Sequence, residues 1–185
     1  YRSVIVLADT GERRDGWPVF VEHPVPEPCL RVLSRGFAGR LVRLYSLVQQ
    51  ALSKRHGNHP PEPVSLLLSG REGGFARRGF FLGEVAKRDT DYVDLRAGQP
   101  LVGVMGAVDQ MFPHELGHIF LRQLCGDAPL GGCNQVHAVS LRTDPARAFD
   151  EGFAEHLQVM AVDDPDADPV TRALADDVGE ERRME

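Results

Sequence analysis

The chain has 185 residues, of which 42% are hydrophobic and 26% are charged, and its formal net charge is −6 at pH 7. This composition predicts an ordinary globular protein with one sizeable core, built as a single domain or as two lobes that share a cleft. An acidic balance of this size repels polyanions, so we expect no nucleic acid partner and no attraction to anionic membranes.

Apolar runs are short throughout the chain. The longest one, LVGVMGAV, begins at Leu101 and is far too short to cross a bilayer, so no membrane segment is expected within this chain. Tyr1 is not an initiator methionine and the chain ends in the charged segment ERRME, which we interpret as a piece cut from a longer protein. The compartment stays open, with an extracytoplasmic or membrane-tethered location preferred.

Three cysteines are present, an odd number. Cys125 and Cys133 bracket a glycine-rich loop and either form a disulfide or remain buried reduced thiols, with Cys29 unpaired in both cases. No C-x-x-C pair occurs in the sequence, so a zinc site built from cysteines is not expected.

The first third of the chain contains two predicted strands and a helix. The strands cover residues 3–8 and 18–22 and are separated by a charged, glycine-containing loop. A long amphipathic helix is predicted from Cys29 to about Arg55, because apolar residues recur there every three or four positions.

Further strands are predicted in the middle of the chain. Residues 64–70 read as a buried strand, residues 74–86 as a hairpin and residues 91–95 as an edge strand. Together with the helices on either side, they indicate an α+β fold with a small mixed sheet and a backing helix.

Helices dominate the last part of the chain. One is predicted to begin near residues 109–112 and to end at the glycine after Cys125. The next begins with Asp144 as N-cap and Pro145 in the first turn, and a further helix is expected after residues 168–169. We therefore divide a single domain into a sheet-containing lobe, residues 1–108, and a helical lobe, residues 109–185.

The helix that begins near Met111 carries two histidines and a glutamate in the sequence HELGH. His114 and His118 are four residues apart, so they project from one face and can chelate one ion. Glu115 is offset by about 100° and lies beside the ion, where a carboxylate can act as general base for a metal-activated water. Neutral imidazoles suit zinc, so the expected cofactor is Zn²⁺. The alternative is a hydrogen-bonded pair of core histidines without metal.

The following helix supplies carboxylates for a third ligand. Glu151 and Glu155 are four residues apart in the sequence DEGFAEH, so they share a face. We assign Glu151 to the metal and Glu155 to a hydrogen bond with the free ring N–H of a ligating histidine.

HELGH followed by DEGFAE resembles the gluzincin metallopeptidases, the group that contains thermolysin and the aminopeptidase N-like enzymes. The resemblance covers about residues 112–157. It implies a zincin-like fold in which the sheet and its backing helix form one wall of a cleft, the HELGH helix forms the floor and the glutamate helix closes the far side. It also implies that residues 92–95 act as an edge strand that pairs with an extended peptide.

Two features depart from the family pattern. Asp150 stands where the aminopeptidase N-like group usually has asparagine, and no tyrosine follows the zinc motif to stabilise an oxyanion. His137 or Arg142 therefore becomes the candidate for that catalytic role.

The function predicted from these residues is zinc-dependent hydrolysis of a peptide bond in a peptide or protein substrate, with Glu115 as general base. The alternative is a catalytically inactive, zincin-derived metal-binding or sensing domain of a larger protein. A zinc amidase that acts on something other than protein is a third reading.

Overall fold

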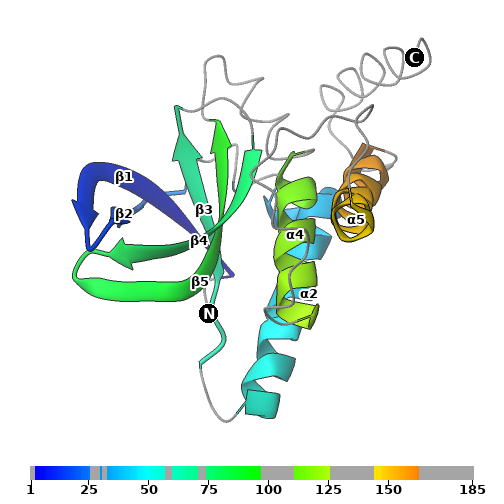
Figure 1. The fold of residues 1–185 in the computed structure, drawn as a ribbon, viewed down its shortest axis with the longest axis horizontal. Coiled ribbons are helices and arrows are strands. Elements are labelled where there is room, and N and C mark those ends of the chain that lie inside the picture. The colour runs from blue at the N-terminus through cyan, green and yellow to red at the C-terminus, as the bar shows by residue number, and fades with distance from the viewer. Residues whose placement is uncertain are drawn as a thin grey trace.

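The computed structural model describes residues 3–25, 30, 33–56, 60–70, 74–96, 111–125 and 144–162. Within these ranges the strands are β1 (Val4–Arg14), β2 (Trp17–His23), β3 (Val64–Ser69), β4 (Gly74–Leu82) and β5 (Val85–Arg96). The helices are α2 (Gly36–His56), α4 (Phe112–Cys125) and α5 (Pro145–Val162). Figure 1 shows the strands on one side of the molecule and the helices on the other.

The five strands close into a barrel in the order β1-β2-β4-β5-β3. Strand β1 runs antiparallel to β2 and parallel to β3, whereas β5 runs antiparallel to β4 and parallel to β3. The contact that joins β2 to β4 is short, since only Val19 and Phe20 pair with Phe81 and Leu82. The barrel is therefore mixed, and its closure depends on a small seam.

The first hairpin turns at Asp15 and Gly16, which both have positive φ angles, of 51° and 81°. Successive positive φ values are typical of two-residue hairpin turns, and the Asp-Gly pair adopts them readily. The predicted loop between the first two strands is wrong, because β1 continues to Arg14 and only these two residues form the turn.

Strand β5 is longer than predicted and lies inside the sheet. It begins at Val85, directly after the turn from β4, and the residues expected to form a separate edge strand, 91–95, are its second half. Val93 pairs with Leu66 on one side and with Ala76 on the other. The expectation that residues 92–95 present an edge to a peptide is therefore wrong.

The barrel interior is filled by apolar side chains, which form a compact cluster of Leu7, Phe20, Leu67, Phe80 and Tyr92. The ring of Tyr92 stands edge-on to those of Phe20 and Phe80, with centroids 5.3 and 5.4 Å apart. Edge-to-face contacts at this distance are favourable beyond the area that they bury. The strands therefore carry one apolar face inward.

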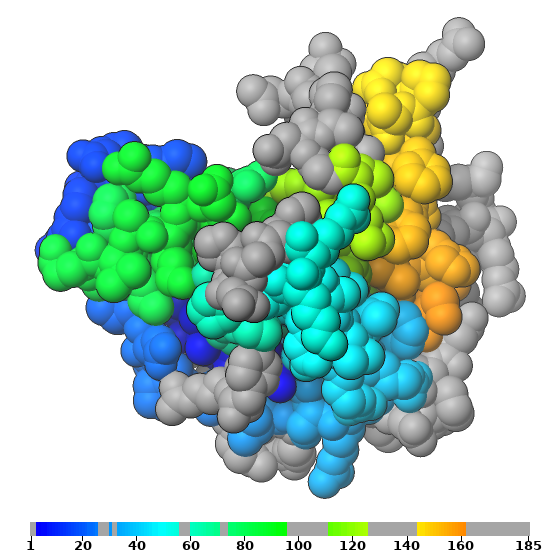
Figure 2. Space-filling view, turned by 90° about the horizontal axis from the view of Figure 1, so that it is seen from below, coloured from blue at the N-terminus to red at the C-terminus, as the bar shows by residue number. Residues whose placement is uncertain are grey.

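The opposite face of the strands packs against the helices and forms a second core. Its members come from both halves of the chain and include Val6, Leu66, Leu41, Leu116 and Leu157. Figure 2, seen from below, shows α2 and α5 gathered on the side away from β4 and β5. Helices α2, α4 and α5 therefore share one core with the sheet.

These observations correct the expected fold class. The zincin-like α+β arrangement, with a sheet as one cleft wall and a helix-rich active-site lobe, is wrong, because the strands close into a five-stranded mixed barrel. The physical reason is that β1, β3 and the second half of β5 carry apolar residues on both faces, so one face fills a barrel while the other receives helices. Irregular registers between Asp9 and Arg13 and between Arg78 and Phe80 add the bends that closure requires.

The long helix also differs from its prediction at the N-terminal end. Gly36 has a φ of +53°, which interrupts a helix, so the continuous helix α2 begins there rather than near Cys29. The other two described helices begin where the sequence predicts them, at Phe112 and Pro145. The further helix expected after residue 168 lies outside the described residues.

None of the described helices combines the length and the apolar character that are needed to cross a membrane.

Candidate metal centre

The candidate site lies where α4 and α5 pack against each other. Gly117, in the middle of HELGH, allows the close approach, because a Cβ atom there would lie 3.0 Å from the Cα atom of Ala154. Helix α5 itself begins as predicted, with the carboxylate of Asp144 accepting a hydrogen bond from the backbone N–H of Arg147 at 2.9 Å. This packing brings Glu151 opposite the two histidines of α4.

Three ligand atoms form a nearly regular triangle. The Nε2 atoms of His114 and His118 are 3.3 Å apart, and each lies 3.7 Å from Oε2 of Glu151. Ligands on a tetrahedral zinc ion, with bonds of about 2.0–2.1 Å, lie about 3.3–3.4 Å from one another. The three side chains that the sequence nominates thus have the spacing that three ligands of one metal ion require.

Asp150 fixes the ring of His118. Its Oδ1 atom lies 2.8 Å from Nδ1 of His118, so Nδ1 donates its proton to the carboxylate and the Nε2 lone pair faces the triangle. The sequence interpretation identifies Asp150 only as a departure from a family pattern and misses this role. The usable signal is an acidic residue directly before the proposed ligand, Glu151.

Glu155 lies beside the other histidine at a longer distance. Its Oε1 atom is 3.9 Å from Nδ1 of His114, which is beyond hydrogen-bond range, and Nδ1 is buried without a hydrogen-bond partner among the described residues. The structure therefore brings Glu155 to the expected ring nitrogen but not into a hydrogen bond with it. The expected hydrogen bond stays a prediction.

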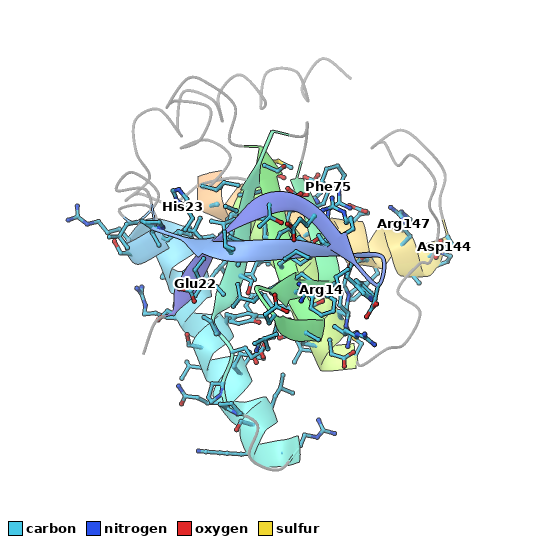
Figure 3. The ribbon with its side chains drawn as sticks, turned by 90° about the vertical axis from the view of Figure 1, so that its left-hand side faces the viewer. Arg14, Glu22, His23, Phe75, Asp144 and Arg147 are labelled. Atoms are coloured by element: carbon cyan, nitrogen blue, oxygen red, sulfur yellow. The ribbon has the colours of Figure 1, made fainter. Side chains whose placement is uncertain are left out.

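Arg147 contacts the other carboxylate oxygen of Glu151, the proposed third ligand. One guanidinium nitrogen, Nη2, lies 3.5 Å from Oε1 of Glu151, the oxygen that does not face the histidines. The arginine thus favours a carboxylate with one oxygen toward the triangle and one oxygen away from it. Figure 3 labels Arg147 and Asp144, which project from the beginning of α5. Sequence reasoning does not identify Arg147, although its spacing of four residues from Glu151 is a usable signal.

Glu115 lies next to the triangle and not within it. Its side chain is buried, and burial raises its pKa to about 7, against the opposing effect of the His118 charge. The backbone of Ala76, in β4, donates a hydrogen bond to it, and a Cβ atom on Gly74 would lie 2.8 Å from Oε1. The start of β4 therefore closes over the carboxylate, and glycine at 74 leaves room for it.

The two histidines have pKa values that shift in opposite directions. Burial lowers the pKa of His114, and the neighbouring His118 lowers it further. Burial also acts to lower the pKa of His118, but the hydrogen bond and charge of Asp150 outweigh it, so this pKa is raised. Without a metal, His118 is therefore the ring that takes up a proton first, and a metal must compete with that proton.

Several nominated residues lie outside this description. His137, Arg142, Cys29 and Cys133 fall outside the described residues, so the proposed catalytic role of His137 stays a prediction. Cys125 is described at the end of α4 as an exposed free thiol, which contradicts a buried position for it.

The arrangement joins three potential metal ligands, two acidic residues beside the ligating rings and a buried carboxylate of raised pKa. Such a set can bind a divalent cation and accept a proton next to it. Comparisons of this chain with family models, with curated proteins and with solved structures found no match.

Proposed function

We propose that this chain is a zinc-dependent hydrolase of peptide bonds. The observation that carries the proposal is the triangle of His114, His118 and Glu151, with sides of 3.3, 3.7 and 3.7 Å, beside a buried glutamate. Two facing imidazole Nε2 atoms with an opposing carboxylate form a donor set that zinc prefers. A purely structural pair of core histidines would leave the adjacent Asp150, Glu151 and Glu155 without a common purpose.

The residues around the triangle have separate tasks in this proposal. His114, His118 and Glu151 would hold the zinc, which would supply a Lewis acid that makes a water molecule reactive near neutral pH. Glu115 accepts the proton of that water on its carboxylate and delivers it to the leaving amine. Asp150 keeps the ring of His118 oriented, and Arg147 holds Glu151 with one oxygen toward the metal.

The first half of β4 is the candidate surface for an extended substrate. Among the described strands, β4 pairs with β2 only at Phe81 and Leu82, so residues 74–78 have a strand neighbour on one side only, β5. Ala76 directs its N–H toward Glu115 from that unpaired edge. A peptide that adds to this edge would pass directly over the proposed general base. This edge replaces residues 92–95, which are covered on both sides.

Zinc binding is tested by titrating metal-free protein and comparing the wild type with Glu151→Ala. We expect about one zinc per chain in the wild type and a loss of affinity of at least about 100-fold in the variant, because one of three protein ligands is removed. His156→Ala is the matched control, since His156 lies on the same helix but is exposed. Wild-type affinity in Glu151→Ala would contradict the assigned ligand set.

Hydrolysis is tested with a quenched fluorescent peptide library. Glu115→Gln should retain zinc and lose turnover by at least about 100-fold, because the amide cannot accept the proton. Unchanged turnover would remove Glu115 from the mechanism. Zinc binding without cleavage of any peptide by the wild type would instead favour the non-catalytic metal-binding domain.

A further inference from the structure

Arg77, on the first half of β4, is held in an unusual way. Its Nε atom donates a hydrogen bond to Oδ2 of Asp94 at 2.9 Å, and the Asp94 side chain is only 2% exposed. Its guanidinium carbon lies 4.5 Å from the ring centre of Phe75, over the ring face. The two contacts fix both the direction and the plane of the guanidinium group.

The outer part of the same guanidinium has nothing to bind. Within the described part of the chain, neither Nη group has a hydrogen-bond partner, and the side chain is 34% exposed. Arginine presents its donors in a rigid fork that matches a carboxylate, and a fork that is already oriented loses little entropy on binding one. An exposed arginine that served only to neutralise Asp94 would not need stacking on Phe75.

The position of Arg77 relates it to the proposed catalytic residue. Phe75 and Arg77 alternate with Gly74 and Ala76 along β4, so the two pairs project from opposite faces of the strand. Gly74 and Ala76 contact Glu115, whereas Phe75 and Arg77 occupy the other face at the same end. Figure 3 shows Phe75 near the upper end of the sheet, away from the closed turn of the hairpin at Arg14.

We propose that Arg77 recognises a carboxylate of the substrate, so that the site selects acidic peptides. The inference rests on the proposed function, because it assumes that an extended peptide binds along the unpaired edge of β4. In an added strand, the substrate side chain opposite Arg77 projects on the Arg77 face, within about two residues of the bond that faces Glu115. The carboxylate belongs to an aspartate or glutamate side chain at that position, or to the C-terminus of a peptide that ends there.

Peptide binding to a variant that cannot cleave the peptide tests this selection separately from catalysis. The protein is zinc-loaded Glu115→Gln, and the probes are fluorescent ten-residue peptides of alanine, glycine and serine that are amidated at the C-terminus. Each peptide carries one glutamate at a central position and has a twin with glutamine there. We expect the best glutamate peptide to bind at least about tenfold more tightly than its twin, with a preference that shrinks as salt rises. A further peptide with no glutamate and a free C-terminal carboxylate separates the two sources of the charge.

Substitution of Arg77 alone would leave the carboxylate of Asp94 buried without its cation, which destabilises the fold. The informative variant is therefore Arg77→Gln combined with Asp94→Asn, which removes both charges and keeps the shapes. In this variant the preference for glutamate should fall below about twofold, with thermal unfolding used to verify that the protein is folded. Arg88→Gln combined with Asp15→Asn is the control, because it removes the same two charges from an exposed ion pair.

Two results would overturn the inference: equal binding of the glutamate and glutamine peptides at every position, or a preference that persists in the double variant. Failure of the proposed function is recognised differently. If the wild type cleaves none of the peptides but the Arg77-dependent preference is present, peptide recognition stands and hydrolysis does not.

Discussion

The interior of the barrel and the contact between α4 and α5 differ in how they treat polar groups. The barrel interior gathers Phe20, Phe80 and Tyr92 at ring separations of 5.3–5.4 Å. Helix α4 instead buries His114 against α5 and Glu115 against the start of β4, so that these two residues are only 7% and 5% exposed. Burial of ionisable groups costs free energy, whereas burial of aromatic rings supplies it. The barrel therefore stabilises the molecule, whereas the candidate site costs free energy in the metal-free protein.

The largest expected effect on stability comes from a substitution in the barrel alone. Gly79 has a φ of +85°, and a Cβ atom there would lie 2.1 Å from the ring of Trp17. Gly79→Ala should lower the free energy of unfolding by about 3 kcal/mol or more, because backbone strain adds to overpacking. Chemical denaturation measures the loss.

Gly83→Ala separates the two causes. Gly83 also has a positive φ, of +56°, but no atom lies within 4 Å of its added Cβ, so only strain remains and the loss should be about 1 kcal/mol. Equal losses in both variants would mean that the contact with Trp17 does not matter.

The second prediction concerns the cost of Glu115. Burial raises its pKa from 4.5 to about 7 in the folded protein. The contribution of a raised carboxyl pKa to the free energy of unfolding is fully present below pH 4.5 and is lost as the pH rises through 7. The free energy of unfolding of metal-free Glu115→Gln should therefore rise relative to that of the metal-free wild type between pH 4 and pH 8. The expected change in this difference is up to about 3 kcal/mol. Chemical denaturation of both proteins across this pH range provides the measurement. A difference in stability that does not change with pH would contradict the raised pKa of Glu115.

The third prediction concerns a substitution that separates α4 and α5 slightly. Gly117→Ala places a methyl group 3.0 Å from the Cα atom of Ala154, so α5 must shift. We expect a loss of about 1–3 kcal/mol in stability and a drop of at least about tenfold in zinc affinity, because Glu151 moves with α5.

Gly152→Ala is the matched control for that shift. Gly152 is exposed on α5, and nothing lies within 4 Å of its added Cβ. Since alanine favours helix, this variant should be as stable as the wild type or more stable by up to about 1 kcal/mol, with unchanged zinc affinity. Parallel loss of zinc in both glycine variants would show that helix separation is not the cause.

The smallest expected effect is at Asp150. Asp150→Asn keeps the shape but removes the charge that orients the ring of His118. Zinc affinity should fall by about 10-fold or somewhat more, as is typical when a partner of a ligating histidine is changed. Competition with a chromophoric chelator measures the change, and wild-type affinity in this variant would make the 2.8 Å contact irrelevant to the metal.

The two regions also differ in how far the sequence predicts them. The helical site follows from local spacing: His114 and His118 lie one turn apart, and Asp144 with Pro145 marks the start of α5. Helical periodicity alone is therefore enough to nominate the ligand set. The role of Asp150 escapes such reasoning, because it depends on how α5 rotates against α4, whereas the spacing of four residues between Arg147 and Glu151 is a local signal.

The barrel is only partly predictable. Individual strands are identified near their observed positions, but closure depends on pairings between distant segments, such as Val4 with Val64, which leave no local pattern. The turn at Asp15 and Gly16 does carry a usable signal, an Asp-Gly pair between apolar runs, although the charged residues around it suggest a longer loop. Apolar side chains on both faces of β1, β3 and the second half of β5 are the remaining clue to a barrel covered by helices.

X-ray absorption spectroscopy of the zinc-loaded protein tests the central claim most directly, because it reports the atoms bound to the metal. We expect a four-coordinate zinc with two imidazole nitrogens, supplied by His114 and His118, and two oxygens at about 2.0–2.2 Å. In His118→Ala the spectrum should lose one imidazole. A sulfur ligand, or an unchanged spectrum in that variant, would contradict the account.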